Sequence, residues 1–204
     1  MKFSSQRIQF GKKPAADAGE EPDGLPTPKK LEAMRLKMQS IERAKEVVAA
    51  LPNVNESLHV VFQKRIDLAD VLDAILAKYG TCERMVLATL TWNEANLKQM
   101  VKWLDQNRVK ELVFMGSVWV RSGNPALLEQ TVDEFRKRGQ PFACLPNHSK
   151  VYCMKFETGE KIIVETSSNM VSSGSYIETA AIFNHAELHD FHAAWISEIG
   201  RAHV

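Results

Sequence analysis

Between residues 59 and 199 the hydrophobic positions switch repeatedly between two periods, and this switching predicts the fold class. Short apolar runs bounded by turn residues predict strands, and apolar positions three and four residues apart predict the helices between them. The predicted strands are 59–63, 84–92, 111–119 and 141–146, and the predicted helices are 67–78, 93–107 and 124–138. Strands that alternate with helices of this length indicate an α/β protein, with parallel strands in a sheet covered by helices.

Three further strands follow without intervening helices, at 150–156, 160–167 and 178–183. A Thr-Gly turn separates the first two, so we expect an antiparallel extension of the sheet. A final helix, 186–199, has Leu188, Phe191, Trp195 and Ile199 at helical spacing and is predicted to bury them. The resulting expectation is a mixed sheet flanked by helices.

The first part of the chain has a different character. Prolines and glycines interrupt residues 1–27, which predicts a disordered arm, with contact to nucleic-acid phosphates as the alternative. Residues 28–52 predict a helix, because Thr27-Pro28 is a start signal and an apolar stripe follows at three-four spacing. This helix packs on its own domain, pairs with a copy of itself, or lies with its basic face along nucleic acid. The remaining 57–204 form the main domain.

Composition narrows the class of protein. The 204 residues are 45% hydrophobic and 25% charged, as in a globular domain, and the net charge of +1 gives no overall field that attracts nucleic acid. The three cysteines are an odd number in apolar surroundings, which favours reduced thiols and the cytoplasm. No apolar run approaches membrane-spanning length, so we expect no membrane partner.

Four polar residues fall at suggestive places in the second half of the chain. His148 and Lys150 are two apart in an extended segment, so their side chains point to one face. Asn169 closes the next strand, and Glu178 opens the one after it. Adjacent strands therefore gather a histidine, a lysine, an amide and a carboxylate, a set suited to chemistry on a phosphodiester.

This pattern resembles the phospholipase D superfamily. The shared features are the His-x-Lys segment, a second strand ending in Thr-Ser-Ser-Asn-Met and a glutamate before a later apolar strand. The likeness is strongest to the small members with a single motif, which are dimeric bacterial endonucleases and phage proteins. It extends over 57–199 in the order of elements and implies a phospholipase D-like fold, with no metal and no cofactor.

The resemblance assigns roles to the four residues. His148 matches the histidine that attacks phosphorus and forms a phosphohistidine. Lys150 and Asn169 match the residues that hold the non-bridging oxygens, where they stabilise negative charge in the transition state. Glu178 matches the glutamate that orients the histidine. The family needs a second histidine as general acid, and because this chain has one motif, the resemblance implies a homodimer with a shared site.

Four other residues are candidate contacts to substrate. Ser167 and Ser168 precede Asn169 and offer hydroxyl donors. Trp119 stands at a predicted strand end, where a parallel sheet presents its ligand crevice, and Arg121 follows it. Stacking on a nucleobase with phosphate contact is one interpretation of this pair, and packing in the core is the other for the tryptophan.

One position departs from the motif of the family. An aspartate is expected five residues after Lys150, and Lys155 stands there instead. The function predicted from the sequence is a metal-independent phosphodiesterase, most specifically a nuclease. The alternatives are a catalytically silent nucleic-acid-binding or structural protein with the same fold, and a phosphodiesterase that acts on phospholipid. His185, His189 and His192 share a face of the last helix, which predicts a solvent face rather than a metal site.

Overall fold

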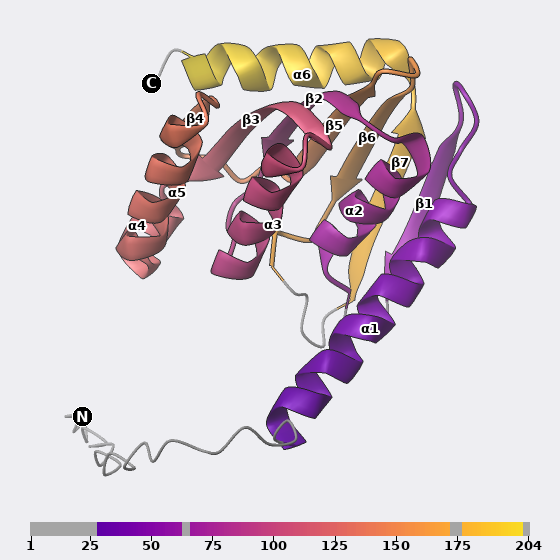
Figure 1. Ribbon diagram of the computed structural model, residues 1–204. Coiled ribbons are helices and arrows are strands. Elements are labelled where there is room, and N and C mark those ends of the chain that lie inside the picture. Colours follow the sequence, from indigo (N-terminus) through magenta and orange to yellow (C-terminus); the bar gives the residue numbers. More distant parts are fainter. Residues whose placement is uncertain (1–27, 63–65, 172–176, 202–204) are drawn as a thin grey trace, which may run out of the picture.

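The computed structural model describes residues 28–62, 66–171 and 177–201 (Figure 1). The predicted arm, 1–27, lies outside these residues. The helices are α1 Pro28–Ala49, α2 Leu68–Tyr79, α3 Glu94–Asp105, α4 Trp119–Gly123, α5 Pro125–Lys137 and α6 Ala186–Arg201. The strands are β1 Ser57–Phe62, β2 Cys82–Ala88, β3 Val109–Ser117, β4 Phe142–Leu145, β5 Val151–Phe156, β6 Lys161–Thr166 and β7 Glu178–Asn184.

The strands form one mixed sheet in the order β1-β7-β6-β5-β2-β3-β4. β2, β3 and β4 are parallel, as expected for strands joined through helices. β5, β6, β7 and β1 run antiparallel to their neighbours and extend the sheet past β2. The predicted α/β class, with a mixed sheet between helices, is confirmed.

Helices cover both faces of the sheet. α6 lies across one face, while α2, α3 and α5 cover the other, and α1 packs on α2 (Figure 1). β2 shows the alternation that this requires, because Met85 and Leu87 enter the larger core and Val86 and Ala88 face α6. A buried side-chain cap sets the start of α2: the side chain of Asp67 accepts a hydrogen bond from the backbone N–H of Ala69 at 3.1 Å.

α6 turns a different face to the sheet from the one predicted. Phe191 is 62% exposed and Ile199 is 40% exposed, whereas His189, Ala193 and Ile196 are buried. The predicted stripe and the buried residues both have helical spacing, and their positions differ by one residue, a rotation of about 100° around the helix axis. The prediction of Phe191 and Ile199 as core was wrong because α6 rests on the sheet through Ala193 and Ile196, while Leu188 and Trp195 of the predicted stripe flank this contact and are partly buried.

Trp119 does not end a strand, since β3 stops at Ser117 and the short helix α4 begins at Trp119. Its side chain is 71% exposed, so the packing interpretation was wrong for this tryptophan. Trp92, by contrast, is buried, and its indole Nε1 donates to Thr131 Oγ1 at 3.0 Å.

Candidate functional site

The four motif residues come together at one end of the sheet. His148 and Lys150 directly precede β5, Asn169 follows β6, and Glu178 is the first residue of β7. Because β5, β6 and β7 are neighbours and alternate in direction, these three points lie side by side. The carboxyl end of β2 reaches the same edge, where Ala88 pairs with Val151.

Main-chain hydrogen bonds connect the segments that carry these residues. The N–H of Thr166 donates to the carbonyl of Lys150 at 3.2 Å, and the N–H of Ser167 donates to the carbonyl of Thr179 at 2.9 Å. In return, the N–H of Thr179 donates to Ser167 Oγ at 2.9 Å. These bonds hold the ends of β5, β6 and β7 in register close to the motif positions.

His148 and Lys150 differ in exposure. His148 is exposed, whereas Lys150 is half-buried. The Nζ of Lys150 donates a hydrogen bond to the main-chain carbonyl of His148 at 3.1 Å. Partial burial lowers the pKa of Lys150, and the nearby carboxylate of Glu178 opposes this shift. A partly desolvated ammonium group interacts more strongly with an anion than a fully hydrated one.

Glu178 is half-buried, and its carboxylate accepts a hydrogen bond from the hydroxyl of Ser167. Ser168, in contrast, is buried, and its hydroxyl donates to the carbonyl of Asn169 at 3.5 Å. The side-chain oxygen of Asn169 is buried without a hydrogen-bond partner among the described residues. Of the two serines, only Ser167 is exposed at this edge.

A buried polar cluster that the sequence did not reveal supports the site from below. Asn147 Nδ2 donates to the carbonyls of Thr89 at 3.1 Å and Met115 at 3.4 Å, and its Oδ1 accepts from the N–H of Ser149 at 2.8 Å. These contacts join Thr89, directly after β2, and Met115, near the end of β3, to the segment that carries His148.

Thr89 is the second member of this cluster. Its hydroxyl oxygen accepts from the hydroxyl of Tyr152 at 3.2 Å and from the N–H of Met170 at 3.3 Å. Thr89 and Tyr152 are fully buried, and burial raises the pKa of the Tyr152 phenol, so it remains a neutral donor. Thr89 therefore ties the end of β2 to the Asn169 segment as well.

Trp119 and Arg121 lie on α4, after the carboxyl end of β3. Trp119 borders an open cavity of about 320 Å³, whose apolar wall includes Trp92, Val120 and Leu127. Trp92 pairs in a parallel bridge with Met170, the residue after Asn169. The cavity thus adjoins the segment that carries Asn169.

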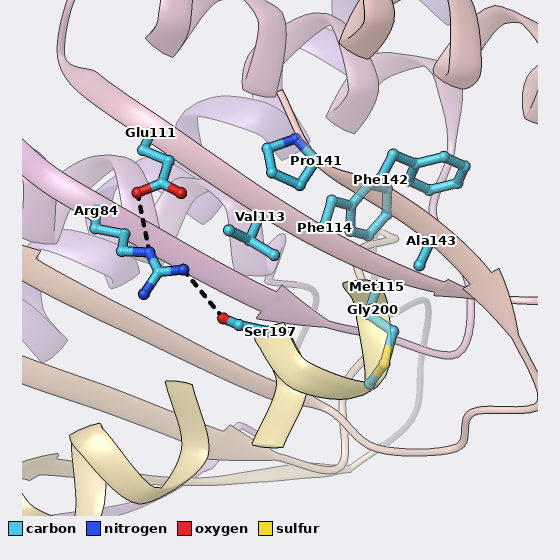
Figure 2. A pocket seen from close by; sticks show the side chains of 10 residues that line it. All are labelled: Arg84, Glu111, Val113, Phe114, Met115, Pro141, Phe142, Ala143, Ser197 and Gly200. Atoms are coloured by element: carbon cyan, nitrogen blue, oxygen red, sulfur yellow. Dashed lines mark hydrogen bonds and ion pairs between the residues drawn. The ribbon is translucent and has the colours of Figure 1, made fainter. Parts of the chain in front are cut away.

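A smaller cavity of about 100 Å³ lies under α6 and is distinct from the motif residues (Figure 2). Arg84 Nε lies 3.0 Å from a carboxylate oxygen of Glu111, and a terminal guanidinium nitrogen donates to Ser197 Oγ at 3.2 Å. The rest of its lining is mostly apolar, including Val113 and Phe142. This arrangement fastens α6 to the sheet.

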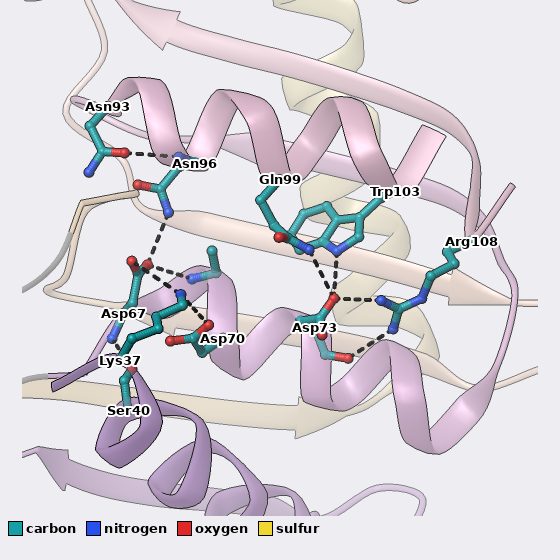
Figure 3. A network of polar contacts seen from close by, with 11 residues as sticks. Lys37, Ser40, Asp67, Asp70, Asp73, Asn93, Asn96, Gln99, Trp103 and Arg108 are labelled. Carbon is teal, nitrogen blue, oxygen red and sulfur yellow. Dashed lines mark hydrogen bonds and ion pairs between the residues drawn. The ribbon is translucent and has the colours of Figure 1, made fainter. Parts of the chain in front are cut away.

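Carboxylates on α2 organise the opposite face (Figure 3). Asp73 Oδ1 accepts from Trp103 Nε1 at 2.7 Å and from Arg108 at 2.6 Å, which joins α2 to the last turn of α3 and to the loop between α3 and β3. Asp67 Oδ1 accepts from Asn96 Nδ2 at 3.0 Å. This network is structural and fixes the helices behind the sheet.

The histidines of α6 are not a solvent face, and that prediction was wrong. His189 is buried with Nδ1 3.0 Å from Asp190 Oδ1, and His192 Nε2 lies 2.8 Å from Glu165. His185 Nδ1 accepts from the N–H of Leu188 at 3.3 Å. Within 28–62, 66–171 and 177–201, no group of three or more potential ligands is placed to hold a metal ion.

The fold of this chain is similar to that of several solved structures. Nuc from Salmonella typhimurium, a phospholipase D family member, matches 70% of this chain and 93% of its own, with TM-score 0.50 and 13% identity. A polyphosphate kinase from Porphyromonas gingivalis matches 74% of this chain at TM-score 0.53 and 12% identity, and this match spans 28% of the kinase. TrmBL2, an archaeal chromatin protein, matches 85% of this chain and 64% of its own, at TM-score 0.50 and 12% identity.

No family model and no curated protein sequence matches the chain. The resemblance is therefore one of structure, and the chain has a phospholipase D-like fold. In the part of the chain that the structure covers, no helix combines the length and the apolar character needed to cross a membrane.

Proposed function

We propose that this chain is a metal-independent phosphodiesterase, specifically a nuclease, with His148 as its nucleophile. The observation that carries the proposal is the meeting of three neighbouring strand ends, which brings His148, Lys150, Asn169 and Glu178 to one edge of the sheet. A nucleophile, a cation, an amide and a carboxylate at one edge meet the needs of phosphoryl transfer.

In the first step a ring nitrogen of His148 forms a bond to phosphorus while the bond to the leaving oxygen breaks. The ammonium group of Lys150 and the amide Nδ2 of Asn169 bind the non-bridging oxygens. Their interaction strengthens as negative charge grows there in the transition state. Partial desolvation of Lys150 increases this effect, because less water competes for the same oxygens.

Glu178 orients His148 by accepting a hydrogen bond from the ring nitrogen that does not attack. The carboxylate already accepts a hydrogen bond from Ser167, whose Oγ is held in turn by the N–H of Thr179. This support limits the positions available to the carboxylate and leaves its second oxygen for the imidazole. Ser167 is therefore a positioning residue in this scheme.

The leaving oxygen needs a proton, and a second copy of the chain supplies it through its own His148. The second step reverses the roles. Water attacks the phosphohistidine, the nitrogen–phosphorus bond breaks, and the second imidazole takes the proton released by the water. One motif per chain thus gives a complete site only in a homodimer.

Nucleic acid is the proposed substrate because of the cavity beside Trp119. Its exposed indole and apolar wall suit the face of a nucleobase. Asn93 and Asn124 line the same cavity and use their Oδ1 atoms to cap α3 and α5, which leaves their Nδ2 groups to donate to a base edge. Arg121, exposed on α4, offers a contact to a phosphate.

The test is cleavage of DNA and RNA by the purified chain in excess EDTA. His148→Ala should abolish cleavage, while the control His59→Ala should leave it unchanged, because His59 is exposed on the edge strand β1. Cleavage that survives His148→Ala, or that requires a divalent metal, would contradict the mechanism.

The second candidate is a silent nucleic-acid-binding or structural protein with the same fold. TrmBL2 is a chromatin protein that binds DNA, and its fold matches this chain over 85% of the length. Binding of DNA by the wild type, with no cleavage under any condition and no effect of His148→Ala, would favour this candidate.

A further inference from the structure

α1 carries an apolar stripe that its own domain leaves uncovered. Leu31, Met34, Met38 and Ile41 are 51%, 53%, 63% and 38% exposed. The sequence pattern predicts that this stripe, which ends at Val48, is a packing face, yet only Val48 is buried. Four large apolar side chains in a row along one helix are an unusual surface for a monomer.

The domain instead holds the neighbouring face of α1. Ser40, Ala44 and Val47 are buried, and Ser40 Oγ accepts from the N–H of Asp67 at 2.8 Å. Lys37 Nζ reaches Asp70 Oδ1 on α2, which adds an ion pair beside this contact. These bonds fix the rotation of α1 about its axis, so that Leu31, Met34 and Met38 of the apolar stripe remain exposed to solvent.

The stripe continues into an open groove. Ile41, Lys45 and Val48 form one side of a hollow of about 550 Å³, and Ala74 and Ala77 of α2 belong to its other side. From Leu31 to Lys45 the accessible seam covers 14 residue steps, about 21 Å of helix, and it ends at the buried Val48. It is therefore long enough for several turns of a second helix.

The spacing of the seam indicates what covers it. Leu31, Met34, Met38, Ile41, Lys45 and Val48 follow one another at intervals of three and four residues without a break. This strict alternation is the narrow seam of a coiled coil, and it fits best against a helix with the same repeat. α1 of a second copy is such a helix, and one surface that contacts itself generates a two-fold dimer. The single lysine in the seam is the kind of polar residue that fixes register.

The position of α1 connects this surface with the candidate site. Its amino-terminal half extends past the sheet at the end where β6 finishes and β7 begins (Figure 1). A partner held there is on the same side of the molecule as the edge that carries His148. The seam and the edge that carries His148 therefore lie on the same side of the molecule.

We propose that α1 packs against α1 of a second copy through this seam, and that this contact brings the two half-sites together. The role of this contact in joining the half-sites rests on the proposed function, whereas the pairing of the two α1 helices is independent of it.

The test compares two single substitutions in the full chain. Met38→Glu places a negative charge in the seam. Gln39→Glu adds the same charge at the next residue of the chain, which is not part of the seam. By sedimentation at micromolar concentration, the wild type and Gln39→Glu should have a mass near twice 23.0 kDa, and Met38→Glu should have a mass near 23.0 kDa. Circular dichroism should show equal helix content in all three, because Met38 is exposed in the single chain.

A wild type that is monomeric, or a Met38→Glu variant that stays dimeric, would overturn the helix pairing. A monomeric wild type in which Met38→Glu increases proteolysis of residues 1–27 would show that the amino-terminal segment covers the seam instead. Loss of both dimer and cleavage in Met38→Glu supports the whole proposal. If the seam controls the dimer but no form cleaves, the proposed function fails and the pairing stands. Full cleavage by monomeric Met38→Glu would refute the shared site alone.

Discussion

Lys155 Nζ lies 2.8 Å from a carboxylate oxygen of Glu83 on the neighbouring strand β2. Lys155 occupies the position where the motif of the phospholipase D superfamily has aspartate, and the ion pair shows how the chain accommodates the reversed charge. The hydrogen bond from Lys155 lowers the pKa of Glu83, with further electrostatic help from the same ammonium group. Position 155 is near the far end of β5, away from His148.

We predict that Lys155→Asp does not increase cleavage, because the aspartate would face Glu83 and not the substrate edge. The like charges should lower the midpoint of thermal unfolding slightly, since both side chains are well exposed to solvent. The double variant Glu83→Lys/Lys155→Asp should restore the midpoint. Calorimetry and the EDTA cleavage assay measure the two effects. A several-fold gain in cleavage by Lys155→Asp alone would show that this position acts on the site.

A second prediction concerns the support beneath His148. Asn147→Ala leaves the carbonyls of Thr89 and Met115 and the N–H of Ser149 without their side-chain partner in a buried place. We expect a loss of about 1–3 kcal/mol in the free energy of unfolding, the usual cost of buried polar groups left unpaired. We also expect slower cleavage, because the segment that holds His148 loses its anchor. Urea unfolding and single-turnover cleavage measure these quantities.

Asn53→Ala is the control, since Asn53 is an exposed turn residue whose side chain bonds only locally, to Glu56 at 2.9 Å. Equal effects of the two substitutions would mean that the buried cluster adds nothing beyond an ordinary surface turn.

Much of the architecture could be predicted because local patterns determine it. The alternation of strands and helices, the antiparallel extension and the order of the motif residues all follow from hydrophobic period and turn residues. Because β5, β6 and β7 are adjacent and alternate in direction, His148, Asn169 and Glu178 lie at one edge of the sheet independently of how the side chains pack.

Which face of a helix is buried could not be predicted with the same success. In α6 the predicted stripe lies beside the buried face: Ala193 and Ile196 form the centre of that face, Leu188 and Trp195 are partly buried at its border, and Phe191 is exposed. In α1 the hydrogen bond to Ser40 and the ion pair between Lys37 and Asp70 hold a less apolar face against the domain, and the more apolar stripe next to it stays exposed. The cluster around Thr89 was invisible for a related reason, because its partners come from segments far apart in the sequence.

A third prediction follows from His189. Its Nδ1 faces Asp190, whereas Nε2 is buried without a hydrogen-bond partner among the described residues, so protonation would bury an unpaired N–H. Burial lowers the pKa of His189, and Asp190 only partly opposes this, while Lys161 and Lys155 lower it further. The unfolded chain therefore binds the proton more readily than the folded one. The contribution to stability is present above about pH 6.5 and is lost as the pH falls below that value.

The free energy of unfolding should thus decline between pH 7 and pH 5, and His189→Leu should flatten this decline. His59→Leu, at an exposed position, should keep the wild-type slope. Urea unfolding at several pH values gives both slopes. An unchanged slope in His189→Leu would rule out His189 as the group responsible.

The last prediction uses the tight contact between Gly116 and Trp92. A Cβ atom at Gly116 would lie 2.4 Å from Cζ3 and 2.6 Å from Cη2 of the indole ring. The ring cannot retreat, because Nε1 is bonded to Thr131 and Phe114 packs edge-on at 5.0 Å between centroids. We expect Gly116→Ala to cost about 1–3 kcal/mol, as is usual for overpacking of a core.

Gly123→Ala provides the matched control for stability, because a Cβ atom there would meet no other described atom within 4 Å beyond its chain neighbours and the backbone of its own helix. It should change the free energy of unfolding little. Since Trp92 pairs with Met170 beside Asn169, displacement of the indole in Gly116→Ala should also slow cleavage. Equal stability of the two variants would mean that the ring moves freely, and the Trp92 bridge would then be too soft to position the Asn169 segment.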